Sequence, residues 1–383
     1  MRKILVIAVV AILLTISVAG GLVLMKPNTN GWNGSNLVSP SIDTVNHPSS
    51  SIPGPLTGSY RASSWTLAWI LSEVYAAYGG VVWVSLNNTG NSPIFVYEIS
   101  FLWSGMSISS SRPTAALIEP GAKVEIGMLS FAAPSSTGHH QYTIRLGLAA
   151  GFPNGNWYDY GPTSIGGNHE VLILEPSSSA NCTIYHNSPQ YYDRINRLVD
   201  FSVTASITQE VKARFPGVYS SMQVVEGYEW VRRNIAYLAD TIDYWQSANE
   251  TLSKRTGDCE DQAILLASII GELGGNARVN IIEGHAFPTV FVGANISVIS
   301  SLRDSIASYY WVNATDVHLT YLTDELGVWL VIDPDGTPYA GGLPSLSAPS
   351  SNSFTDGWTF ESAAWCHEID ATGKANGGWL PFF

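Results

Sequence analysis

A helix that is apolar on nearly all sides is predicted in the second half of the chain, with a recognisable signal at each end. Asp258 is a good N-cap residue, and Asp261 follows in the capping-box position. Gly274 and Gly275 provide the stop that ends many helices. Between these signals, residues 263–270 (AILLASII) offer no polar face to water. The helix is therefore expected at the centre of a folded domain.

Cys259 falls in the first turn of this helix. Free backbone N–H groups and the positive end of the helix dipole favour a thiolate there. Its three acidic neighbours, Asp258, Glu260 and Asp261, oppose that shift. A nucleophilic thiol at this position therefore needs a further activator, such as an imidazole.

Two later segments supply an imidazole and a carboxylate. Residues 276–283 are predicted to form a strand, Gly284 interrupts it, and His285 opens a second strand that runs to residue 292. Residues 328–336 form a later strand that ends in a turn containing Asp333. If the later two strands pair antiparallel, His285 lies opposite Asp333 with about 5 Å between the Cβ atoms. The sequence thus predicts a nucleophile, a base and an orienting carboxylate in Cys259, His285 and Asp333.

These segments resemble the motifs of the transglutaminase-like superfamily: Gly-Asp-Cys-Glu-Asp at 257–261, Gly-His-Ala at 284–286 and Trp-Leu-x-x-Asp-Pro at 329–334. The resemblance covers residues 190–344 and is closer to prokaryotic transglutaminase-like cysteine proteinases than to cross-linking animal enzymes. It implies a papain-like α+β domain with a central helix packed on an antiparallel sheet. It also implies that Cys259 is the nucleophile, His285 the general base and acid, and Asp333 the orienting group. Trp245 and Gln246 become candidates for the oxyanion region.

Some features depart from the family pattern or leave an alternative open. Pro288 lacks a backbone donor, which suggests a sheet edge or a bulge. Residues 298–309 have helical spacing, so we expect an inserted helix that could cover the cleft. Asn313 is an alternative third member of the triad.

Composition excludes several classes of protein. Charged residues make up only 13% of the chain and apolar residues 45%, which is unlike a disordered polyelectrolyte. Lys and Arg number 18 against 31 Asp and Glu, a net charge of −13, so we expect no nucleic-acid partner. The sequence gives no metal site and no phosphate loop, and no cofactor is expected.

The first residues predict export. Arg2 and Lys3 precede an uncharged run over residues 4–25, which reaches about 33 Å as a helix, enough for a bilayer core of about 30 Å. The positive flank places the bulk of the chain outside the cell. Cleavage near residues 17–19 is the alternative and would give a secreted protein. Six possible glycosylation sites fit an exported chain: Asn33, Asn87, Asn181, Asn249, Asn295 and Asn313.

Periodicity and composition divide the chain into five parts. Residues 1–26 are predicted to be a transmembrane signal anchor, 27–64 a Ser/Pro/Asn-rich stalk and 65–176 an all-β sandwich of immunoglobulin-like type. Residues 177–350 are the transglutaminase-like domain, and 351–383 a tail of unknown role. Residues 64–78 look helical, without an evident role. Three cysteines are too few for a disulfide scaffold, but Cys182 and Cys366 could pair and leave Cys259 as the free thiol.

The sequence therefore predicts a membrane-anchored, outward-facing thiol enzyme that acts on a protein or peptide substrate at the cell surface. Thiolate attack on an amide would form an acyl-enzyme, which water resolves by hydrolysis or an amine by transfer. Of the two reactions, we predict hydrolysis. The alternative is a catalytically inactive cell-surface binding or scaffold protein, although the three intact residues argue against it.

Overall fold

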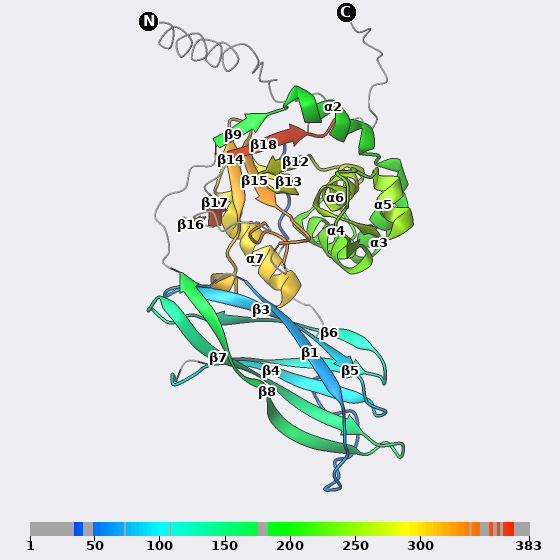
Figure 1. Ribbon diagram of the computed structural model, residues 1–383, viewed down its shortest axis with the longest axis vertical. Helices are drawn as coiled ribbons and strands as arrows, with labels where there is room; N and C mark the ends of the chain where they lie inside the picture. The colour runs from blue at the N-terminus through cyan, green and yellow to red at the C-terminus, as the bar shows by residue number, and fades with distance from the viewer. Residues whose placement is uncertain are drawn as a thin grey trace, which may run out of the picture.

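The computed structural model describes residues 34–40, 49–72, 74–107, 109–174, 183–336, 339–344, 352–354, 358–360 and 363–370. They form an all-β part followed by an α+β part (Figure 1). The predicted anchor at 1–26 lies outside these residues. Within the described ranges, no helix is long and apolar enough to span a membrane.

The all-β part consists of a three-stranded sheet, β1-β3-β6, and a five-stranded sheet, β2-β8-β7-β4-β5. Both sheets contribute to one core, in which Phe101 stacks on Phe131 with ring centroids 4.0 Å apart. This arrangement is consistent with the predicted immunoglobulin-like sandwich. The strands are β1 (Trp65–Leu71), β2 (Val74–Tyr75), β3 (Gly79–Asn88), β4 (Ile94–Trp103), β5 (Ser109–Ile118), β6 (Lys123–Ala132), β7 (Gly138–Gly151) and β8 (Trp157–Leu174).

The helical reading of residues 64–78 is wrong. β1 pairs antiparallel with β3 along its whole length, and β2 pairs with β8. Trp65, Leu67, Trp69 and Leu71 pack on the sandwich core while the residues between them are exposed. That period of two is a strand pattern, and it decides the structure here.

The predicted stalk also lies against the folded parts where it is described. Leu37 is buried in the core of the α+β part, and its N–H donates to the carbonyl of Val292 at 2.9 Å. Pro55 accepts a hydrogen bond from the N–H of Trp157 in β8 at 2.8 Å. These segments are anchored because their apolar residues and backbone groups find partners on the domains.

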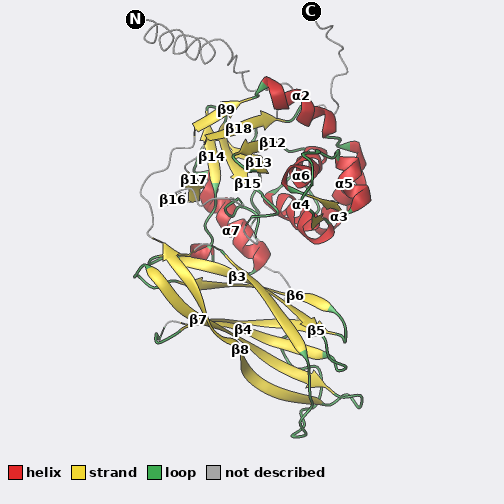
Figure 2. Ribbon diagram, in the orientation of Figure 1, coloured by secondary structure: helices red, strands yellow, loops and turns green. Residues whose placement is uncertain are grey.

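The α+β part is built around α6 (Cys259–Leu273), in which residues 263–267, 269 and 270 have almost no exposed surface. Figure 2 shows the helices gathered on this half of the molecule. The others are α2 (Pro189–Leu198), η1 (Ser202–Thr204), α3 (Ala205–Arg214), α4 (Ser221–Asn234), α5 (Ala248–Lys254), α7 (Val298–Tyr310) and η2 (Ala314–Asp316). The apolar helix is therefore buried, as its sequence predicts.

A six-stranded sheet in the order β14-β15-β13-β12-β18-β9 completes this half. All neighbours are antiparallel except β18 and β9. Side chains from all six strands meet in one apolar cluster. The sheet is curved, since it brings Nε2 of His186 and Oδ2 of Asp324, on its two edge strands, within 3.7 Å of each other. The strands are β9 (Thr183–His186), β12 (Ala277–Ile282), β13 (His285–Gly293), β14 (Tyr321–Asp324), β15 (Gly327–Val331) and β18 (Ala363–Glu368).

β18 comes from the segment whose role the sequence left open. It fills the gap between β12 and β9, and Cys366 on it is fully buried. Three short pieces lie outside this sheet: the pair β10 (Ala236–Tyr237) and β11 (Thr256–Gly257), and the hairpin β16 (Asn352–Phe354) and β17 (Trp358–Phe360). At least part of the C-terminal segment therefore belongs to the α+β domain.

Candidate active site

The N-terminus of α6 is fixed by Asp261. Its carboxylate accepts hydrogen bonds from the N–H of Asp258 at 3.4 Å and from the N–H of Gln246 at 2.7 Å. Asp258 has an extended backbone, as an N-cap residue should. The segment before α5 is thereby tied to the turn that presents Cys259.

Cys259 is half-buried, and its thiol donates a hydrogen bond to the Glu260 carboxylate at 3.1 Å. Burial raises the pKa of Cys259 above its ordinary value, and the hydrogen bond and charge of Glu260 raise it further. The N–H of Ala286 acts in the opposite direction by donating to the sulfur. The resting thiol is therefore protonated, and it lies beside the start of β13.

His285 and Asp333 meet at the other side of this turn. Nε2 of His285 lies 2.7 Å from Oδ2 of Asp333, and both side chains are almost fully buried. Burial alone would lower the pKa of His285, but the hydrogen bond and charge of Asp333 outweigh it and the net pKa is raised. Asp333 therefore contacts Nε2 of the His285 ring, and Nδ1 remains available to a reacting group.

The pairing of the strands explains how His285 and Asp333 come together. β13 pairs antiparallel with β15, and the chain leaves β15 through a hydrogen bond from the N–H of Ile332 to the carbonyl of Pro288 at 3.1 Å. Asp333 follows directly, so its carboxylate returns toward the first residue of β13. The predicted sheet edge or bulge at Pro288 is therefore wrong: Pro288 lies in a central strand, opposite Val279 of β12, and its carbonyl accepts the bond that extends the ladder to β15.

Asp335 is a site residue that the sequence reasoning missed. Its N–H donates to Oδ1 of Asp333 at 3.1 Å, and its own Oδ2 is buried without a partner among the described residues. Burial raises the pKa of Asp335 to about 7, and the charge of Asp333 contributes. The Asp-Pro-Asp-Gly turn in the sequence was the available signal, because it places two carboxylates two residues apart.

Further acidic groups surround the thiol. Burial raises the pKa of Asp258 to about 7, with help from the charges of Glu260 and Asp261. Burial likewise raises the pKa of Asp261 to about 6. Burial raises the pKa of Tyr237, and ionisation of the nearby Cys259 thiol would raise it further. The site is crowded with carboxyl groups that partly hold their protons near neutral pH.

Trp245 and Gln246 are not placed at the thiol by their hydrogen bonds. The indole N–H of Trp245 donates to Asp243 at 2.7 Å, and its ring stacks on Tyr191. The side-chain oxygen of Gln246 is buried without a partner among the described residues. Their role in the oxyanion region stays a prediction.

The inserted helix is present as α7, but its contacts lie away from Cys259. Tyr309 and Tyr310 at its end hydrogen-bond to Glu226 and Glu229 of α4. The helix lies between the sheet and the sandwich (Figure 1). The expectation that it covers the cleft is therefore not supported, because its apolar side is used for packing on α4.

Asn313, the alternative third member, lies at the interface with the sandwich. Its N–H donates to Ser130 at 3.1 Å and its side chain to Asp316 at 3.2 Å. Among the sequons, Asn249, Asn295 and Asn313 are exposed and Asn87 is half-buried in β3, while Asn33 and Asn181 lie outside the described residues. Cys182 does too, so its bridge to Cys366 stays a prediction.

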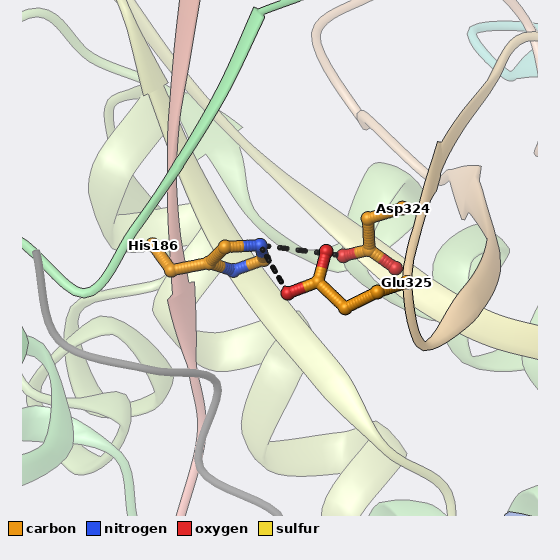
Figure 3. A group of neighbouring side chains, drawn as sticks. All are labelled: His186, Asp324 and Glu325. Atoms are coloured by element: carbon orange, nitrogen blue, oxygen red, sulfur yellow. Dashed lines mark ion pairs between the residues drawn. The ribbon is translucent and has the colours of Figure 1, made fainter.

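One group of potential metal ligands occurs elsewhere in the described residues. His186 of β9 faces Asp324 and Glu325 at the β14–β15 turn (Figure 3). These residues come from segments far apart in the sequence, which is why no ligand spacing was visible. The group shares no residue with the Cys259, His285 and Asp333 constellation.

Comparison with known proteins finds a family match within the α+β part. Residues 203–334 match the profile of the transglutaminase-like superfamily. A candidate cysteine protease from Cytophaga hutchinsonii is 11% identical, covering 61% of this chain and 76% of its own, with a TM-score of 0.22. A candidate ApaA protein from Bordetella pertussis is 16% identical over 30% of this chain and 95% of its own, with a TM-score of 0.21. These two likenesses are too low to carry an argument, and no curated protein matches the sequence.

Proposed function

We propose that this chain, whose residues 203–334 form a transglutaminase-like superfamily domain, is a thiol enzyme that hydrolyses peptide or other amide bonds. The observation that carries the proposal is the buried 2.7 Å contact between His285 and Asp333, next to the helix turn that presents Cys259. A carboxylate on one ring nitrogen fixes the tautomer and orientation of an imidazole base.

The chemistry follows from these positions. His285 would accept the proton of the Cys259 thiol, and the thiolate would attack the carbonyl carbon of the substrate. The tetrahedral intermediate collapses when its C–N bond breaks, and the imidazolium gives its proton to the leaving amine. His285 would then take a proton from water, which attacks the thioester and releases the acid and the free thiol. Backbone N–H groups at the start of α6 would donate to the developing oxyanion.

The charge of the site supports a reaction that begins from a neutral thiol. Glu260 stabilises the protonated form of Cys259, and Asp333 raises the pKa of His285. The thiol must leave Glu260 and face the imidazole before it can react. Substrate binding is the natural trigger, because it displaces water and contacts around the half-buried sulfur.

We place the enzyme at the cell surface, anchored by residues 1–26, with a protein or peptide as its substrate. The uncharged N-terminal run with its basic flank and the exposed sequons Asn249, Asn295 and Asn313 support this location. Amine transfer in place of hydrolysis depends on which acceptor reaches the acyl-enzyme. The alternative of an inactive binding or scaffold protein draws support from the thiol's bond to Glu260.

A thiol-directed vinyl-sulfone probe separates the enzyme from the scaffold. We expect Cys259 of the native chain to react about 10²-fold faster or more than in the His285→Ala variant, since a positioned base contributes at least that factor. Cys259→Ala identifies labelling at this residue, and His169→Ala on the sandwich is the matched control. Equal rates in the native chain and His285→Ala would contradict the proposed activity.

A further inference from the structure

The curved sheet brings its two edge strands together at one end. His186 ends β9, and Asp324 and Glu325 form the turn between β14 and β15 (Figure 3). Nε2 of His186 lies 3.7 Å from Oδ2 of Asp324 and 3.5 Å from Oε1 of Glu325. His186 and Asp324 are largely buried, whereas the Glu325 side chain is 62% exposed. The three ligand atoms therefore converge at a point that solvent can reach from one side.

The other ring nitrogen of His186 already has a hydrogen-bond partner. Nδ1 lies 2.9 Å from Oε1 of Glu368, whose side chain is only 4% exposed. Because an ionised carboxylate can only accept, Nδ1 carries the proton in the neutral ring and Nε2 presents its lone pair. Nε2 then faces two carboxylate acceptors, Oε1 of Glu325 and Oδ2 of Asp324, and the second of these already accepts a hydrogen bond from Arg278. A proton, a cation or a water molecule must therefore lie between Nε2 and the carboxylates.

The distances favour a cation. A charge-assisted N–H···O bond is about 2.7–2.9 Å long, shorter than either separation at Nε2. Two ligands at about 2.0–2.1 Å from a tetrahedral Zn²⁺ are about 3.4 Å apart. The observed separations of 3.5 and 3.7 Å are close to that value.

The charges of the cluster point the same way. Arg278 is fully buried, and its guanidinium donates to Asp324 at 2.6 Å and contacts Glu368 at 3.1 Å. One guanidinium balances one of the three carboxylates of Asp324, Glu325 and Glu368. A histidine that binds a metal through Nε2 is neutral, so the cluster would then keep two negative charges, which a single divalent cation would neutralise.

We propose that His186, Asp324 and Glu325 bind a divalent transition-metal cation such as Zn²⁺, with Glu368 orienting the imidazole. Histidine nitrogen with carboxylate oxygens is a ligand set typical of Zn²⁺, and a carboxylate behind the histidine is the usual supporting partner. A fourth position is open to water beside the exposed Glu325. The ion would join β9 to the β14–β15 turn and so close the two edges of the sheet.

Titration of the full chain with Zn²⁺ alone, followed by calorimetry, tests the proposal. The chain carries Cys259→Ala so that metal binding at the thiol is removed from every comparison. We expect one Zn²⁺ per chain and a higher melting temperature with the metal. Glu325→Gln should weaken binding at least tenfold, and because that side chain is exposed, the variant should fold normally. His186→Ala should weaken binding more strongly.

His139→Ala is the matched control, since His139 pairs with Glu170 on the surface of the sandwich. It should bind Zn²⁺ as the parent does. Cobalt(II) gives a second readout, because its visible absorption is strong in a four-coordinate site and should be lost in His186→Ala. The proposal is overturned if the parent binds no Zn²⁺, or if Glu325→Gln and His186→Ala bind it as tightly as the parent. The cluster would then be an ion-pair network completed by a proton on His186.

Discussion

At the scale of single residues, the thiol is surrounded by acidic groups in addition to the one carboxylate that a catalytic triad requires. Glu260 holds the thiol proton at 3.1 Å, while Asp333 holds the imidazole at 2.7 Å. One contact opposes the thiolate and the other strengthens the base. The proposed reactivity depends on the balance between these two contacts, and not on the presence of three residues alone.

Asp333→Asn tests the base directly. The hydrogen bond and charge of Asp333 raise the pKa of His285, so their loss should lower it. Since the neutral imidazole is the base, reactivity rises with pH through this pKa. In the variant the rise should occur at lower pH, with a plateau reduced about 10²-fold or more because the imidazole is no longer held in the right tautomer.

The measurement is the rate of Cys259 alkylation by iodoacetamide between pH 5 and 9. Asp304→Asn, an exposed change on α7, is the control and should leave the profile unchanged. A midpoint that stays in place in Asp333→Asn would show that Asp333 does not set the pKa of His285.

Asp335→Asn tests how burial of this carboxyl group affects the free energy of unfolding. The pKa of Asp335 is raised from 3.8 to about 7 by burial, so the folded chain holds a proton here that the unfolded chain loses. The free energy of unfolding therefore falls as pH rises from about 4 to 7. Asparagine cannot ionise, and we expect the variant to be more stable than the native chain by about 1–2 kcal/mol at pH 8 and similar at pH 4.

Urea unfolding at pH 4, 6 and 8 measures this difference. Asp304→Asn is again suitable as the control, because its side chain is in water in both states. If Asp335→Asn were equally destabilising at every pH, the carboxyl would be held ionised by a partner and the argument would fail.

At the scale of elements, α6 was predictable because its signals are local. Its N-cap, its apolar interior and Gly274 all lie within a short stretch of sequence, and burial follows from the absence of a polar face. β18 was not recognised, because it acquires its partners from β12 and β9 far away in the chain. β1 was misread although its period-two pattern is local, because the helical interpretation of residues 64–78 overlooked that alternation.

Gly271 is the point at which α6 packs against Phe201, and its substitution tests this contact. A Cβ atom there would lie 2.2 Å from two ring atoms of Phe201, which would have to move. Alanine favours a helix by about 1 kcal/mol over glycine, but overpacking costs about 1–3 kcal/mol. We expect Gly271→Ala to be destabilising on balance in urea unfolding.

The Phe201→Ala background supplies the control for this change. With the ring gone, only the helix preference remains, so adding Gly271→Ala should then be neutral or stabilising. The same loss of stability in both backgrounds would mean that contact with Phe201 is not the reason for the glycine.

At the scale of the whole molecule, the sandwich and the α+β half form one framework. The sequence separates the two parts by periodicity at about residue 176, but it does not show that they share a core. Val81 of β3 and Met128 of β6 pack into the core of the α+β half. Whether such residues face a partner domain cannot be read from a strand pattern, because both faces of these strands are apolar.

Arg112 makes a polar contact between the same two halves. It extends from β5, and its guanidinium donates to the carbonyls of Tyr310 at 3.4 Å and Trp311 at 3.0 Å, at the end of α7. It also lies 4.7 Å from the ring of Trp311. Burial lowers the pKa of Arg112 to about 10, so the buried charge depends on these partners.

Arg112→Ala should therefore loosen the two halves from each other. Loss of hydrogen bonds from a charged donor and the carbonyls left unpaired should cost about 2–3 kcal/mol. In calorimetry we expect a lower melting temperature and two separated transitions, because the two apolar cores then unfold independently. Limited proteolysis should cut the chain between the domains. Arg145→Ala, an exposed change on β7, should do neither, and a native-like single transition in Arg112→Ala would show that the shared apolar contact alone couples the halves.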